Sequence, residues 1–80
     1  RDLLDEQGRI TRWSGKAKEQ EAILRYLLDK FEPDHSYTEQ QVNELLRTWY
    51  LDADFVLVRR SLIDAGLLQR TRDGARYWRT

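Results

Sequence analysis

The sequence predicts an α+β fold of the winged helix-turn-helix type, in which three helices pack against a C-terminal β-hairpin, the wing. Three stretches carry apolar residues at helical spacing, and only a few turn residues separate the last two stretches. Two short runs of β-forming residues follow, joined by an Asp-Gly pair that is a strong hairpin signal. The 80 residues make one small domain. We expect this domain to span residues 14–80, after an N-terminal arm or linker formed by residues 1–13. We also expect a piece of a longer protein, because methionine is absent even at position 1.

The arm and the first helix come first in the chain. Arg9 to Trp13, "RITRW", form a candidate short strand because β-forming residues dominate them. Ser14 is the candidate N-cap of the helix that follows. The apolar side of this helix consists of Ile23, Leu24, Leu27, Leu28 and Phe31. Pro33 ends the helix, because the residue before a proline resists helical dihedral angles. Residues 35–37 are long enough for one brief extended segment.

The second helix begins in "YTEQQV". Thr38 is the candidate N-cap, and Gln41, three residues later, can return the hydrogen bond to complete a capping box. Tyr37 and Val42 stand at the two positions of a hydrophobic staple. The core face then continues at helical spacing through Val42, Leu45, Leu46 and Trp49.

The third helix follows after a short turn. Asp52 or Asp54 caps its start, and the apolar pattern runs to about Ala65. Gly66 then stands where a left-handed C-cap favours glycine.

This third helix separates two adjacent arginines. On a wheel of 100° per residue, Arg59 lies within the apolar arc, so we expect its stem to pack on the core and its guanidinium to be paired. Arg60 lies on the opposite arc and is a candidate contact for a phosphate or a base edge. The same arc carries Asp64 and the apolar Leu57, which suit a protein partner better than DNA.

The predicted wing is rich in arginine. The runs "LLQRT" and "RYWRT", joined by "RDGA", contain Arg70, Arg72, Arg76 and Arg79. This density of guanidinium groups could straddle a phosphate backbone. The alternative is that arginine is a soluble residue on the exposed face of a ribbon. Tyr77 and Trp78 point to opposite faces of a strand, so one of them is buried. A turn of two or of three residues leaves open which one.

The overall charge disfavours a dedicated DNA-binding domain. The 14 basic and 14 acidic side chains cancel, whereas such domains are usually visibly basic. The distribution is uneven, however: from residue 59 onward, six arginines and two aspartates give +4, so the first 58 residues carry −4. This asymmetry is suggestive of an anionic partner for the C-terminal part.

No pattern typical of an enzyme is present. The single histidine, His35, stands in a connecting segment, and the chain has no cysteine, so we expect neither a metal site nor a cofactor. There is no glycine-rich phosphate loop, and no serine stands in a plausible arrangement with a histidine and an acid. No apolar run approaches the roughly 18 residues of a membrane span. We therefore expect a non-enzymatic, cytoplasmic protein that does not enter a membrane.

Three blocks of the sequence, "FEPDHSYTEQQVNELL", "RRSLIDAGLLQR" and "DGARYWR", resemble an uncharacterised bacterial family known only as a domain of unknown function. The resemblance covers roughly residues 16–80. It implies a link to transcription, since such domains occur alone or attached behind helix-turn-helix regulators. The family tends to have a proline just before the first helix, where this chain has "WSGK".

Two functions follow as hypotheses. The first is a winged-helix module of a bacterial transcription regulator that contacts the phosphates of double-stranded DNA through Arg60, Arg70, Arg72, Arg76 and, secondarily, Arg79. The second is a protein-interaction or homodimerisation module, in which Leu57, Arg60 and Asp64 meet another chain and DNA is not bound.

Overall fold

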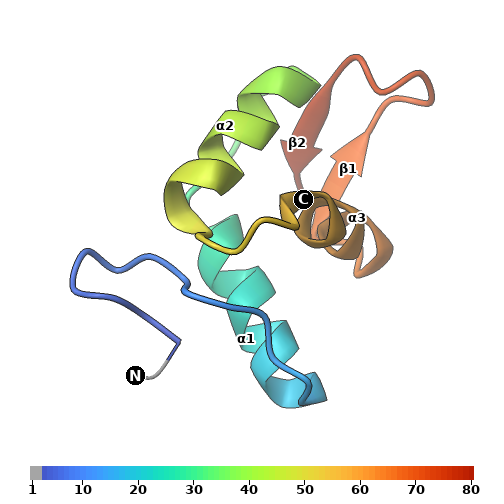
Figure 1. Cartoon of the computed structure of the whole chain (residues 1–80). Helices are drawn as coiled ribbons and strands as arrows, with labels where there is room; N and C mark the ends of the chain where they lie inside the picture. The colour runs from blue at the N-terminus through green and yellow to red at the C-terminus, as the bar shows by residue number, and fades with distance from the viewer. Residues whose placement is uncertain (1–2) are drawn as a thin grey trace.

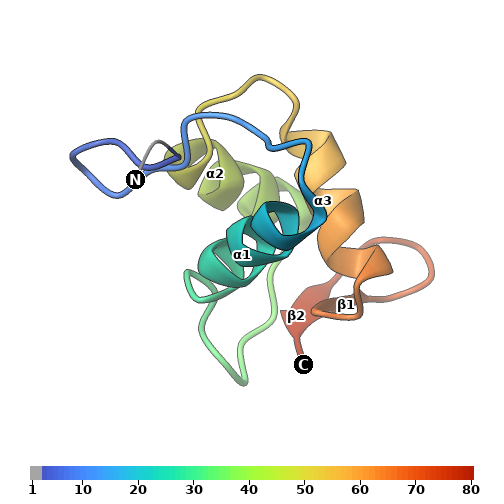
Figure 2. The same ribbon diagram turned by 90° about the horizontal axis from the view of Figure 1, so that it is seen from below.

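The computed structural model of the chain describes residues 3–80. Its elements, in chain order, are α1 (Ala17–Leu28), α2 (Glu39–Trp49), α3 (Phe55–Asp64), β1 (Leu68–Arg70) and β2 (Tyr77–Arg79). Helix α3 contacts α1, α2 and β1. Figures 1 and 2 show the hairpin beside α3, on the side of the molecule away from the N-terminal arm. The predicted α+β architecture with a winged-helix-like layout is confirmed. Residues 1–2 of the predicted arm lie outside the described residues.

Helix α1 begins later than the sequence suggested, so the assignment of Ser14 as its N-cap is wrong. The N-cap is Lys16, whose side chain makes no capping hydrogen bond. Ser14 is buried instead, and its hydroxyl accepts a hydrogen bond from the Lys16 backbone N–H at 3.0 Å while it donates to the Glu19 carboxylate. A serine hydroxyl readily accepts a hydrogen bond from the backbone N–H two residues later. This local bond favours a turn at Ser14 rather than the start of a helix. The predicted apolar side is confirmed for Ile23, Leu24, Leu27 and Leu28, which are buried. Phe31 is buried as well but lies beyond the end of α1 at Leu28, so the helix stops earlier than the predicted end at Pro33.

Helix α2 starts as predicted. The Gln41 N–H donates to Thr38 Oγ1 at 3.1 Å, and the Thr38 N–H donates to Gln41 Oε1 at 2.9 Å, so the capping box is complete. Val42 and Leu46 are fully buried, and Leu45 and Trp49 are partly buried against the same core.

Helix α3 is capped by Asp54, one of the two predicted candidates. The Leu57 N–H donates to Asp54 Oδ1 at 3.1 Å. The helix ends with Ala65 as C-cap, and Gly66 follows with φ of 75°, the left-handed conformation that glycine adopts without strain. Both the predicted end and the predicted glycine are confirmed.

The hairpin has a longer turn than the sequence suggested. Strands β1 and β2 pair Leu68 with Arg79, Gln69 with Trp78 and Arg70 with Tyr77. The Thr71 N–H donates to the Arg76 carbonyl at 2.9 Å, which leaves a connection of four residues, 72–75, rather than the two or three expected. The turn is stabilised by side chains: Asp73 Oδ1 accepts from the Thr71 hydroxyl at 2.8 Å and from the Ala75 N–H at 3.0 Å. Asp73 therefore serves as an acceptor inside a wider loop.

The register of the hairpin settles which aromatic residue is inside. Tyr77 is buried, and Trp78 is 37% exposed on the outer face. Tyr37 extends the sheet, because its N–H and C=O form an antiparallel bridge with those of Tyr77, with both hydrogen bonds at 2.8 Å. Within the brief extended segment expected at residues 35–37, Tyr37 thus adds a one-residue β-bridge beside β2.

The predicted strand at Arg9 to Trp13 is wrong, because only Ile10 pairs. Its N–H donates to the Trp49 carbonyl at 2.7 Å, and its C=O accepts from the Leu51 N–H at 2.8 Å. The side chain of Ile10 is buried in the core that joins the three helices to Leu68 and Tyr77 of the hairpin. A further isolated bridge joins Ile10 to Leu4. None of the helices within residues 3–80 is long and apolar enough to cross a membrane.

Candidate functional site

The adjacent arginines of α3 have different environments. The side chain of Arg59 is 16% exposed, and its Nη1 donates to Asn43 Oδ1 at 2.5 Å and lies 3.7 Å from Glu39 Oε2. Arg60 is exposed, and no hydrogen bond or ion pair to another part of residues 3–80 involves its guanidinium. The orientation deduced from the helical wheel is therefore confirmed for both residues. The full charge of Arg60 is available to a partner.

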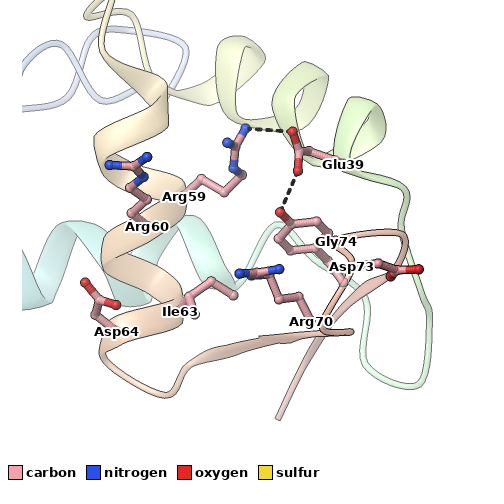
Figure 3. A pocket seen from close by; sticks show the side chains of 9 residues that line it. Glu39, Arg59, Arg60, Ile63, Asp64, Arg70, Asp73 and Gly74 are labelled. Atoms are coloured by element: carbon pink, nitrogen blue, oxygen red, sulfur yellow. Dashed lines mark hydrogen bonds and ion pairs between the residues drawn. The ribbon is translucent and has the colours of Figure 1, made fainter.

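Glu39 joins the pairing of Arg59 to the hairpin. The Tyr77 hydroxyl donates to Glu39 Oε1 at 2.8 Å, while Glu39 Oε2 faces Arg59. One carboxylate thus links β2, α2 and α3, as Figure 3 shows. Burial, and then the hydrogen bond to Glu39, raise the pKa of Tyr77 above its ordinary value. This hydroxyl is therefore protonated at neutral pH and can donate the hydrogen bond to Glu39.

The sequence reasoning missed both partners of Arg59. Glu39 and Asn43 stand four residues apart and therefore on one face of α2. Their signal in the sequence is a polar pair at a spacing of four residues on the helix that precedes the one carrying Arg59.

A pocket of about 400 Å³ opens between α3 and the hairpin. Figure 3 shows the side chain of Arg70 reaching across it from the hairpin toward Ile63 of α3. Charged side chains dominate the lining, which consists of Glu39, Arg59, Arg60, Ile63, Asp64, Arg70, Asp73, Gly74 and Tyr77. Two of the predicted DNA-contacting arginines, Arg60 and Arg70, are among the lining residues.

The other arginines of the hairpin divide into two groups. Arg72 and Arg76 are exposed in and beside the turn, with no hydrogen bond from their guanidinium groups to any described residue. Arg79 lies at the other end of the ribbon, opposite Leu68, and is partly buried. Its Nη1 donates to the Leu28 carbonyl at 3.3 Å and to the Phe31 carbonyl at 3.0 Å. The guanidinium of Arg79 therefore completes the C-terminal end of α1, and we assign it to the structure rather than to a binding surface.

Arg70 has an intermediate role. It is exposed, yet its Nη1 donates to the backbone carbonyls of Thr71 at 3.1 Å and Arg72 at 3.2 Å. These bonds hold the guanidinium in one orientation without neutralising it, because both acceptors are uncharged.

The residues predicted for a protein interface lie on the outer side of α3 and the turn before it. Leu57 is 38% exposed, and the preceding turn adds Leu51, which is 45% exposed. Asp64 is exposed and lines the pocket together with Arg60.

The single histidine lies outside the pocket. The ring of His35 packs on that of Tyr37 with 4.6 Å between centroids. Within residues 3–80, no group of three or more His, Cys, Asp or Glu side chains is arranged to hold a metal ion. The lining of the α3–hairpin pocket contains three arginines and three carboxylates.

Comparison with known proteins agrees with the resemblance noted in the sequence. The profile of a family described as uncharacterised proteins conserved in bacteria (DUF2087) matches residues 9–79, which includes every helix and strand. No curated protein and no solved structure matches the chain. Because the match spans nearly the whole chain, the protein belongs to this family of uncharacterised bacterial proteins.

Proposed function

We propose that this domain is a non-enzymatic winged-helix module of a bacterial transcription regulator, which contacts the phosphates of double-stranded DNA through α3 and the hairpin. In winged-helix proteins, the helix in the position of α3 is the one that enters the major groove. The residues proposed to carry the contact are Arg60 on α3 and Arg72 and Arg76 on the hairpin, with Arg70 between them.

The observation that carries this proposal is the set of arginines without internal partners. Arg59 and Arg79 are engaged within the fold, whereas Arg60, Arg72 and Arg76 form no ion pair with any carboxylate in residues 3–80. Unpaired guanidinium groups suit phosphate oxygens, which they contact by charge-assisted hydrogen bonds.

The same surface limits how well the domain can recognise a particular DNA sequence. Asp64 and Leu57 occupy the exposed face of α3, where a sequence-reading helix would offer donors and acceptors to base edges. The net charge of zero gives no long-range attraction to DNA. We therefore expect contacts to the backbone to dominate, with little preference for sequence.

The salt dependence of DNA binding tests this function. Three phosphate contacts should give a slope of about −2.7 for log K against log salt concentration, because each contact contributes about −0.9. Fluorescence anisotropy with a labelled duplex, measured across several salt concentrations, gives this slope. In the variant R60Q/R70Q/R72Q/R76Q, which removes every arginine proposed to contact phosphate, the slope should approach zero.

The control for lost charge is Arg12→Gln, which removes one exposed arginine of the arm outside the α3–hairpin pocket. It should leave the slope near the wild-type value. Absence of wild-type binding in dilute buffer would refute the proposal, and so would equal effects of R12Q and R60Q.

A second candidate function rests on the exposed leucines. Leu51 and Leu57 flank the start of α3, and apolar side chains exposed in this way are typical of contacts with another protein. In this case we expect a homodimer that Leu57→Asp converts to a monomer, as measured by sedimentation velocity. Leu4→Asp is the matched control, since Leu4 is also 38% exposed but lies in the arm. A wild-type domain that is monomeric at all concentrations would exclude the homodimer.

A further inference from the structure

The α3–hairpin pocket is lined by two guanidinium groups that no carboxylate neutralises. Arg70 reaches into it from the hairpin, and Arg60 lines its rim on α3 with its guanidinium directed away from Arg70. Neither forms an ion pair with a described residue. We infer that this pocket holds one phosphate group of the DNA backbone, gripped by both arginines at once. The inference rests on the proposed function and goes further, because it assigns one phosphate to one pair of residues.

Arg70 is oriented before anything binds. A guanidinium carries five N–H donors, and Nη1 of Arg70 directs its own to the carbonyls of Thr71 and Arg72. The edge formed by Nε and Nη2 remains free, and this fork matches the spacing of two phosphate oxygens. Because the side chain is already held, binding costs less rotamer entropy than for a mobile arginine.

Arg60 supplies the second, adaptable donor. It lies on the solvent side of α3 at the rim of the pocket, and its guanidinium is bonded to no described residue. Its long side chain can therefore turn toward a phosphate held by Arg70. One fixed and one mobile guanidinium can surround a tetrahedral group from two sides.

Two of the three carboxylates that line the pocket are already occupied. Glu39 accepts from Tyr77 and pairs with Arg59. Asp73 accepts from the Thr71 hydroxyl and the Ala75 N–H, and the hydrogen bond from Thr71 above all lowers the pKa of Asp73. Glu39 is thus paired with a guanidinium, whereas both donors to Asp73 are uncharged, so Asp73 keeps its negative charge.

Asp64 differs from both in having no hydrogen-bond donor among the described residues. It is exposed, and no donor within residues 3–80 is bonded to its carboxylate. A phosphate in the pocket would meet the charge of Asp64 directly. Asp64 should therefore weaken phosphate binding, and its neutralisation should strengthen it.

The size of the pocket admits more than a bare phosphate. A volume of about 400 Å³ lies at the lower end of the range for small-ligand pockets, so a phosphate with its sugar fits. Such a group is present both in a DNA backbone and in a free nucleotide. The experiment therefore includes both sources.

A double-mutant cycle tests the shared phosphate. Duplex affinity is measured at low salt for the wild type, R60Q, R70Q and R60Q/R70Q. Each single change should weaken binding roughly tenfold, and the double variant should be little weaker than either, because removal of one arginine already releases the phosphate. The matched cycle of R60Q with R76Q should give the product, roughly a hundredfold, since Arg76 lies outside the pocket lining.

Asp64→Asn provides a test that a folding defect cannot imitate. It should tighten duplex binding several-fold, and this gain should disappear in the R60Q/R70Q background. The thermal unfolding midpoint of R70Q is compared with the wild type, because Arg70 also supports the turn. If R70Q is destabilised, the comparison of Asp64→Asn in the wild-type and R60Q backgrounds decides instead.

The outcomes separate the two proposals. Absence of wild-type duplex binding overturns the proposed function and with it this inference. Duplex binding in which the losses from R60Q and R70Q multiply, or in which Asp64→Asn changes nothing, overturns the inference and leaves the function standing. Binding of a deoxynucleoside monophosphate that depends on Arg60 and Arg70, but that never competes with duplex DNA, also overturns it.

Discussion

At the scale of single residues, two side chains of the same type have different partners because of their positions on a helix. Arg59 and Arg60 are neighbours, yet one is paired beneath the surface with Glu39 and Asn43 and the other is free. The helical period alone determines this difference, so it could be predicted from sequence. Tyr50 shows the opposite case: it is only 2% exposed, and its hydroxyl has no hydrogen-bond partner among the described residues. Nothing in the sequence indicates a buried unpaired hydroxyl.

We expect Tyr50→Phe to stabilise the domain by about 1 kcal/mol, because it removes a buried polar group that gains no hydrogen bond in the fold. Burial first, and then the charges of Asp52 and Asp54, raise the pKa of Tyr50 to about 12. Above its unfolded pKa of about 10, the unfolded chain loses the tyrosine proton while the native chain keeps it, so stability falls as pH rises.

Urea denaturation at neutral pH and again near pH 11 measures both effects. The wild type should lose stability between the two conditions, and Tyr50→Phe should lose less. A Phe variant that is less stable than the wild type at neutral pH would show that the hydroxyl has a partner after all.

Among the elements, the hairpin depends most on contacts that span the sequence. Its strands have three residues each, which is too short for a stable ribbon in isolation. The Tyr37–Tyr77 bridge, the Glu39–Tyr77 hydrogen bond and the Arg79 contacts with the end of α1 attach it to the helices. The hairpin could be predicted from its Asp-Gly turn. Its four-residue connection could not, because side-chain bonds of Thr71 and Asp73 decide the turn.

Glu39→Ala should loosen the hairpin. It removes the acceptor of Tyr77 and leaves the charge of Arg59 without its ion-pair partner, so we expect a loss of about 1 kcal/mol, reduced from the buried value because Glu39 is half exposed. Amide hydrogen exchange at Thr71 and Tyr77 should accelerate more than in the helices. The control is Gln40→Ala, an exposed neighbour on α2. Equal exchange in the two variants would contradict the anchoring role of Glu39.

At the scale of the whole molecule, periodicity and capping signals fixed most of the architecture in advance. The three helices, the capping box at Thr38 and the glycine at position 66 all follow from local rules. The arm could not be predicted in the same way, because Ile10 is buried through contacts with α1 and with residues near Tyr50 that lie far along the chain. The pocket likewise combines residues of α2, α3 and both strands of the hairpin, and of its three arginines only Arg60 and Arg70 were expected to act together.

The pairing of Ile10 with Trp49 and Leu51 has a mechanical consequence. The arm is hydrogen-bonded to the point where α2 ends and the turn into α3 begins. Because Ile10 is also buried in the core, a displacement of the arm would be transmitted to the segment that joins α2 to α3, the helix that carries Arg60.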